Sequence, residues 1–174
     1  MFEIGEYVVF GTEGVCTVEA IGPLDMEGVS KEKLYYTLAP VGRVGNNRIF
    51  APVESKRVVM RRIITEPEAR DLIRIIDDIE PLEVADDKRR EETYKAILQS
   101  CDYIKIVQLI KGIYARRVAR HEIGKKLPAI DERYFSMAEN SLYSELSFPL
   151  NIHKDEVRDY IIEATGGDVN SIVE

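Results

Sequence analysis

A change in hydrophobic periodicity near residue 64 constrains the fold of this chain more than any other feature of its sequence. Before it, short runs rich in β-branched and aromatic residues alternate with turn residues, a pattern typical of strands. After it, apolar residues recur at intervals of three and four, which is typical of amphipathic helices. The sequence therefore predicts an α+β protein with two domains, residues 1–64 and residues 65–174.

The first domain is predicted to be a small, strongly bent sheet or a partly open barrel, because several strands fall within so short a segment. Its aromatic residues could in principle form a cage for a methylated lysine, but we expect them to form the core. These aromatic residues are Tyr7, Phe10, Tyr35, Tyr36 and Phe50. The expected strands are Tyr7–Phe10, Val15–Ile21, Leu34–Ala39, Arg48–Ala51 and Val58–Met60.

The second domain is predicted to be a bundle of five helices. Thr65 and Glu68 have the spacing of a capping box, and Pro67 suits a first helical turn. Asp102 is a second expected cap, at the start of a helix that runs to about His121. The other helices are expected from Asp86 or Asp87 to Ser100, from about Asp131 to Ser147, and from about Lys154 to Ala164.

The charge of the chain is distributed unevenly. The formal net charge is -7, yet residues 88–126 carry 11 basic and 4 acidic residues. Segments 65–87 and 127–174, on either side, are strongly acidic. A local field of one sign can steer a charged partner even on a chain of the opposite net charge. The block indicates either a surface for phosphate groups or an ordinary solvated helix face.

No group of residues in the sequence is typical of an enzyme. The two histidines, His121 and His153, lie outside ligand motifs, and no glycine loop is followed by the lysine and helix of a phosphate-binding loop. Cys16 and Cys101 lack motif spacing, so we expect each to be a small buried residue. We expect no catalytic site, no cofactor and no metal.

The sequence also favours a cytoplasmic protein with no membrane partner. No apolar run approaches the roughly 20 residues that a membrane span needs. The first residues include Glu3 and Glu6 and no basic residue, unlike a secretory signal.

The basic block predicts contacts with nucleic acid. Arginine and lysine on adjacent helices suit a surface that follows phosphates, and Lys111 is expected on the same exposed face. No zinc-finger spacing or RNA-binding aromatic motif is present, so base-specific recognition is not expected. The candidate DNA-binding residues are Arg89, Arg90, Lys95, Arg116, Arg117, Arg120, Lys125 and Lys126.

Motifs along nearly the whole chain resemble CarD-family transcription regulators and the polymerase-interacting module of the transcription-repair coupling factor. The first is the turn–strand–turn start from Met1 to Gly14, with Gly5 before and Gly11 after the apolar triplet Tyr7-Val8-Val9. The others are Tyr94-Lys95 with Leu98, Ser100 and Asp102; the Leu109–Arg117 helix; Ile130-Asp131-Glu132-Arg133-Tyr134; Ala138-Glu139; Leu142-Tyr143-x-Glu145-Leu146; and Asp155-Glu156-Val157.

This resemblance implies a fold, a function and partners. The fold would be a small Tudor-like β-barrel followed by an α-helical bundle. The barrel would dock on the β subunit of bacterial RNA polymerase through a strand edge. The helical domain would touch promoter DNA near the melting region and modulate the stability of the open complex. The polymerase-contacting arginines of some relatives are not clearly matched, and the candidate positions here are Leu24, Arg48 and Phe50.

The chain departs from the family pattern in one respect. Well-studied members insert a tryptophan wedge into the DNA minor groove, and this chain contains no tryptophan. The corresponding region is Glu83–Arg90. The resemblance therefore favours a transcription regulator, with a protein–protein adaptor that binds polymerase without DNA as the alternative. The oligomeric state and the direction of regulation stay open at this point.

Overall fold

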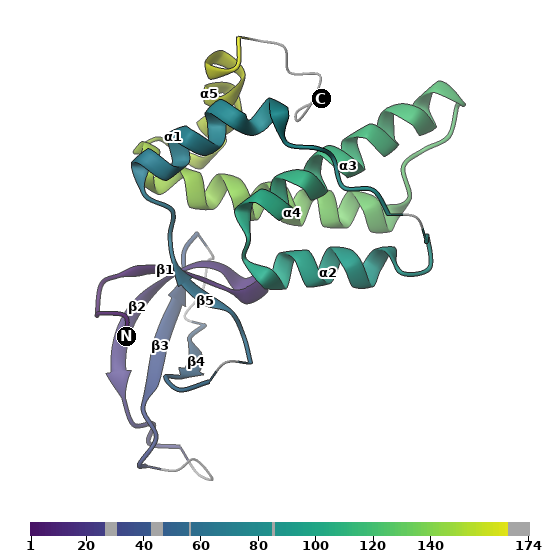
Figure 1. Ribbon diagram of the computed structural model, residues 1–174. Helices are drawn as coiled ribbons and strands as arrows, with labels where there is room; N and C mark the ends of the chain where they lie inside the picture. The colour runs from purple at the N-terminus through teal and green to yellow at the C-terminus, as the bar shows by residue number, and fades with distance from the viewer. Residues whose placement is uncertain (27–30, 43–46, 56, 85, 167–174) are drawn as a thin grey trace. The chain divides into compact units, whose positions relative to one another are not determined.

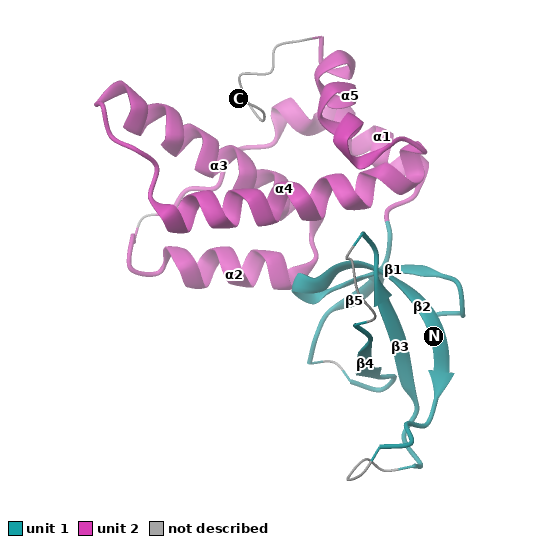
Figure 2. Cartoon of the chain, turned by 180° about the vertical axis from the view of Figure 1, so that it is seen from behind, with its two compact units in different colours: residues 1–63 teal, residues 64–174 magenta. Residues whose placement is uncertain are grey.

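The computed structural model describes residues 1–26, 31–42, 47–55, 57–84 and 86–166. The chain divides into two compact units, Met1–Ile63 (unit 1) and Ile64–Glu174 (unit 2), drawn in different colours in Figure 2. Unit 1 contains the strands and unit 2 contains the α-helices (Figure 1). The predicted α+β class is confirmed.

Unit 1 is built on a five-stranded antiparallel sheet in the order β4-β3-β2-β1-β5 (Figure 1). β2 therefore lies in the centre, and β4 and β5 form the two edges. A short 3-10 turn, η1 (Gly11–Glu13), joins the first two strands. The strands are β1 (Tyr7–Phe10), β2 (Gly14–Gly22), β3 (Tyr35–Pro40), β4 (Ile49–Pro52) and β5 (Met60–Arg62).

The last strand begins later than the sequence predicted. Val58 and Val59 have high strand propensity, but each is 44% exposed and lies before β5. The register with β1 pairs Phe10 with Met60 and Val8 with Arg62. Pairing with β1 thus outweighs local propensity. Gly11 faces Val58 closely, and a Cβ on that glycine would lie 2.7 Å from the valine side chain.

The main apolar cluster of unit 1 lies on one face of the sheet, and Tyr7, Tyr35 and Phe50, which were predicted for the core, are outside it. Tyr36 is 4% exposed and packs with Leu38 and Ala51. Phe50 is opposite Thr37 in the β3–β4 register, so it points to the other face and is 43% exposed. Tyr7 is 39% exposed. The prediction that these three are core residues was wrong, because residues of a strand alternate between faces.

Unit 2 is helical, and its helices lie close to the predicted ranges. α4 extends beyond its predicted end, with Pro149 in its last turn and Asn151 in the left-handed region after it. The elements are α1 (Glu66–Ile75), η2 (Ile76–Asp78), α2 (Arg90–Ser100), α3 (Tyr103–Glu122), α4 (Ala129–Leu150), η3 (Lys154–Glu156) and α5 (Val157–Ala164).

Two predicted helix caps are confirmed and one is displaced. Glu68 accepts a 2.8 Å hydrogen bond from the Thr65 N–H, completing the capping box of α1. The Asp102 carboxylate accepts from the N–H groups of the first turn of α3. α2 begins at Arg90, later than expected, because Asp86 accepts from the Lys88 N–H in a turn that precedes the helix.

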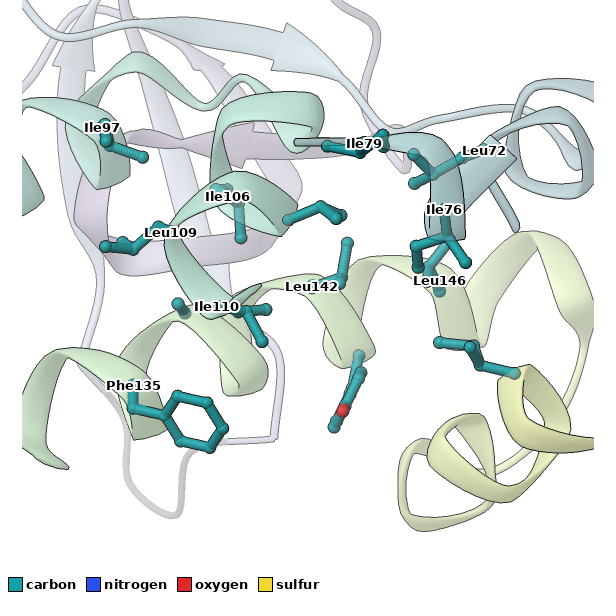
Figure 3. Close-up of a cluster of buried hydrophobic side chains, with 14 of the residues drawn as sticks. Leu72, Ile76, Ile79, Ile97, Ile106, Leu109, Ile110, Phe135, Leu142 and Leu146 are labelled. Carbon is teal, nitrogen blue, oxygen red and sulfur yellow. The ribbon is translucent and has the colours of Figure 1, made fainter. Parts of the chain in front are cut away.

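One apolar cluster fills the interior of unit 2 (Figure 3). Leu72 and Ile76 face Leu142 and Leu146 of α4, and α3 supplies Ile106, Leu109 and Ile110 to the same cluster. Burial of such side chains is the main favourable term in the folding of this unit.

The segment between η2 and α2 packs directly on α3. The Leu82 N–H donates a 2.8 Å hydrogen bond to the Gln108 carbonyl. A Cβ on Gly112 would overlap the Leu82 carbonyl oxygen and would lie 3.1 Å from the Leu82 Cβ. A glycine at position 112 therefore permits this close approach of backbone to helix.

Candidate functional site

In unit 1, two of the three candidate polymerase-contacting residues, Arg48 and Phe50, lie beside or on the edge strand β4. Phe50 projects from β4 on the face opposite the core. Arg48 precedes β4 and is exposed, and Ala51, on the other face, is 5% exposed. Leu24 follows β2 and is half-buried. An edge strand presents backbone groups that can pair with another strand, and a large apolar side chain beside it can anchor the contact.

Arg48 forms an ion pair with Glu19 of β2. Between Val18 and Ala20 the β2–β3 register shifts by one residue, so Glu19 is the additional residue of a β-bulge. The bulge thus places a carboxylate beside the arginine. The two side chains are 32% and 38% exposed, so the pair contributes little stability and leaves the guanidinium accessible.

In unit 2, the eight candidate DNA-binding residues do not form one exposed face. Four of them are exposed, namely Arg89, Lys95, Lys125 and Lys126. Arg116, Arg117 and Arg120 are half-buried, and Arg90 is 9% exposed. The expectation that Arg90 lies on the exposed basic surface is therefore wrong.

Arg90 and Arg116 instead contact one buried carboxylate. Asp131, in the first turn of α4, is completely buried. Its Oδ2 lies 2.7 Å from Arg90 Nη1 and 3.2 Å from Arg116 Nε. These contacts join the starts of α2 and α4 to α3, and a buried charge needs such partners.

Tyr94 completes this buried network. Its hydroxyl donates a 3.2 Å hydrogen bond to Asp131 Oδ1. Burial raises the pKa of Tyr94, and the negative charge and hydrogen bond of Asp131 raise it further. The phenol therefore stays protonated at neutral pH and acts as a donor. Asp131 consequently receives contacts from two arginines and one tyrosine.

Two further arginines are also engaged within unit 2. The Arg117 guanidinium lies 4.3 Å from the centre of the Phe135 ring, in a cation–π contact. Arg120 Nε donates a 2.7 Å hydrogen bond to the Lys126 carbonyl oxygen. The second contact fixes the chain just after α3.

Lys111 was expected on the exposed face but is 7% exposed. Its ammonium group donates to the carbonyl oxygens of Ile76 and Asp77, at 3.0 and 2.9 Å. Burial lowers the pKa of Lys111, and nearby acidic residues oppose that shift. Lys111 therefore stabilises the end of η2 and is not a DNA ligand.

The exposed basic residues that remain lie mostly at one end of unit 2. α2 and α4 begin at this end, and the loop after α3 reaches it (Figure 2). We call these residues the basic end: Lys88, Arg89, Lys125 and Lys126.

The region that corresponds to the family's tryptophan wedge offers no exposed apolar side chain among its described residues. Val84 is half-buried and packs on the core, and Glu83 is exposed. Ala85 lies outside the described residues.

Sequence reasoning missed the role of Asp131. Its position suggested only the start of a helix, where an acidic residue is ordinary. Glu145 of α4 was missed too, although it is 3% exposed and accepts a 2.9 Å hydrogen bond from the Ile64 N–H. No local pattern marks either residue, because their partners are distant in sequence.

Neither a metal-binding cluster nor a membrane-spanning helix occurs in the part of the chain that the structure describes. No set of three or more histidine, cysteine or acidic residues there is arranged to hold a metal ion. No helix there has both the length and the apolarity to cross a membrane. Both cysteines, Cys16 and Cys101, are buried, as predicted.

Comparison with known families identifies unit 1. Residues 2–64 match the family model of the CarD-like/TRCF RID domain. This segment is therefore a CarD-like domain of the type that interacts with RNA polymerase in transcription-related proteins, and the resemblance is confirmed for residues 2–64. The match ends one residue beyond the last residue of unit 1. A comparison with curated proteins found no match.

Proposed function

We propose that the protein is a bacterial transcription regulator that binds the RNA polymerase β subunit through unit 1 and promoter DNA through unit 2. By holding both partners it modulates the stability of the open complex near the melting region. The family match over residues 2–64 carries the polymerase part of this proposal. The exposed cations of the basic end support the DNA part, since phosphate contacts dominate binding that is not sequence-specific.

Docking by strand addition at β4 fits the geometry of unit 1. The proposal includes a Tudor-like barrel shape for this sheet. β4 is an edge strand, and its side chain Phe50 is accessible although it is large and apolar. Backbone pairing would supply affinity, and Phe50 would fill a pocket of the partner. The proposal also includes Arg48 and Leu24 as contact residues.

Replacing Phe50 with glutamate is expected to weaken binding of the full chain to the polymerase β subunit by about tenfold or more, because buried aromatic anchors dominate interface energies. The matched control is Val58→Glu. Val58 is as exposed as Phe50, at 44% against 43%, but it lies before the opposite edge strand. Calorimetric titration measures both. Equal affinities for the two variants would exclude β4 as the docking edge.

DNA binding by the full chain is expected to be sequence-tolerant and strongly salt-dependent. Reversing two charges with Lys125→Glu and Lys126→Glu should lower the slope of log affinity against log salt by about two, because each phosphate contact contributes about 0.9. The control pair Lys31→Glu and Lys33→Glu makes the same charge change on exposed residues of unit 1. Fluorescence anisotropy across a salt series measures the slope, and affinity independent of salt would contradict phosphate contacts.

The alternative function is an adaptor that binds polymerase and does not engage DNA. One observation favours it: Arg90 and Arg116, two of the eight candidate ligands, form ion pairs with acidic residues of the same unit. Polymerase binding together with no DNA affinity at low salt would establish the adaptor.

A further inference from the structure

The exposed carboxylate of Asp87 lies between two arginine side chains. Its Oδ1 is 2.9 Å from Arg116 Nη2 and 3.3 Å from Arg90 Nη2. Two guanidinium donors thus converge on one oxygen atom. The Asp87 side chain is 65% exposed, so this oxygen position lies at the surface of unit 2.

The two arginines do not depend on Asp87 for their placement. Asp131 holds both of them from the buried side, and it is completely inaccessible to solvent. Two positive charges therefore face one buried carboxylate. One positive charge remains, and Asp87 balances it at the surface.

A phosphate oxygen, like the carboxylate oxygen that now occupies this position, is anionic and accepts hydrogen bonds from guanidinium groups. Arginine is well suited to phosphate, because its planar guanidinium presents several donors in a fixed geometry. An exposed carboxylate is a weakly held occupant, since solvent-exposed ion pairs contribute little. The exposed cations Lys88 and Arg89 follow Asp87 directly and would attract a phosphate chain to the same place.

We propose that Arg90 and Arg116 form an oxyanion site for a backbone phosphate of DNA, and that Asp87 occupies this site in the unbound protein. Asp87 then acts as an internal competitor: it must move away before a phosphate binds, and its charge lowers DNA affinity. This inference rests on the proposed DNA-binding function and adds the regulation of one contact to it.

The decisive variant is Asp87→Asn in the full chain, with Asp86→Asn as the matched control. Asp86 is the adjacent residue in the same turn, and the structure shows it bonded to the Lys88 N–H, a role that an asparagine oxygen can keep. Both variants remove one negative charge, but only Asp87 contacts the arginines. Asp87→Asn should tighten binding to duplex DNA about fivefold, the effect expected of a like charge about 4 Å away in water. Asp86→Asn should stay within about twofold.

Inorganic phosphate provides a readout that does not require DNA. At equal ionic strength, replacing chloride by phosphate should raise the thermal unfolding midpoint of Asp87→Asn more than that of the wild type or Asp86→Asn, because a ligand of the folded state stabilises it. Adding Arg116→Gln to Asp87→Asn should abolish both the phosphate response and the gain in DNA affinity.

The outcomes separate this inference from the proposed function. If the wild type binds DNA and the two single variants behave alike in both assays, the site is overturned and the DNA-binding function stands. If no variant binds DNA but phosphate selectively stabilises Asp87→Asn, the oxyanion site is supported and its DNA ligand is overturned. The whole inference is supported if Asp87→Asn increases both DNA affinity and stabilisation by phosphate, and if adding Arg116→Gln removes both increases.

Discussion

Replacing Asp131 with alanine is expected to lower the free energy of unfolding of unit 2 by about 3–5 kcal/mol, the usual cost of removing one partner from a buried ion pair. Asp131 is completely buried, and two arginines and a tyrosine contact its carboxylate. Without it, Arg90 stays buried with only the exposed Asp87 to balance two positive charges. The large loss of stability therefore comes mainly from buried positive charge that lacks a counter-charge, and less from the lost contacts themselves.

The measurement is denaturant unfolding of the full chain, followed by the helical circular dichroism signal. Glu132→Ala is the control, because Glu132 is the next residue of the same helical turn but is exposed. Its effect should stay within about 0.5 kcal/mol, as at most surface positions. If Asp131→Ala lowers the free energy of unfolding no more than Glu132→Ala does, the two arginines must reach solvent or other partners in the variant.

Gly112→Ala is expected to destabilise unit 2 by about 1–3 kcal/mol, the usual cost of overpacking. Helix propensity alone would predict the opposite, a gain in stability, since alanine is favoured over glycine in a helix interior by about 1 kcal/mol. The new Cβ would overlap the backbone of Leu82, which cannot rotate away as a side-chain end can. The Leu82 to Gln108 hydrogen bond would be strained at the same time.

Ala115→Gly provides the comparison for this second prediction. Ala115 is exposed on the same helix, so its replacement measures the cost of glycine in α3 without any packing change. Chemical denaturation should show destabilisation for both variants, although one replaces glycine with alanine and the other replaces alanine with glycine. Stabilisation by Gly112→Ala would mean that the segment before α2 does not pack closely against α3 at Gly112.

The features that could be predicted from the sequence are those set by neighbouring residues. The capping box of Thr65 and Glu68 and the cap at Asp102 depend on groups within three residues, and both were identified correctly. Helix ranges followed from the spacing of apolar residues such as Leu72 and Ile76, which the structure buries. The CarD-like start was recognisable because Gly5 and Gly11 bracket the apolar strand Tyr7–Phe10.

The remaining features depend on tertiary contacts. The register of β5 is set by pairing with β1, so the valines before it stay outside the strand despite their propensity. Phe50 was assigned to the core because its residue type is usually buried, whereas the β3–β4 register directs it outward. That outward position is what makes it a candidate anchor.

The candidate DNA site was predicted least well, and for a physical reason. Counting charges treats each arginine as exposed, but Arg90 and Arg116 bind Asp131, which is distant in sequence from both. Lys111 was misplaced for the same reason, since its partners are carbonyl oxygens at the end of η2. Lys125 and Lys126 lie in a loop, where no helix packs over them, and they are exposed as expected.

The network around Asp131 also has an evolutionary consequence. A substitution at Asp131, Arg90 or Arg116 alone leaves an unbalanced charge in the interior, so a lineage that changes one of them passes through a weakened protein. These three positions should therefore covary among close relatives, being retained together or replaced together by apolar residues. Tyr94 is under a weaker constraint, because phenylalanine would remove one donor to Asp131 but would leave no charge unbalanced.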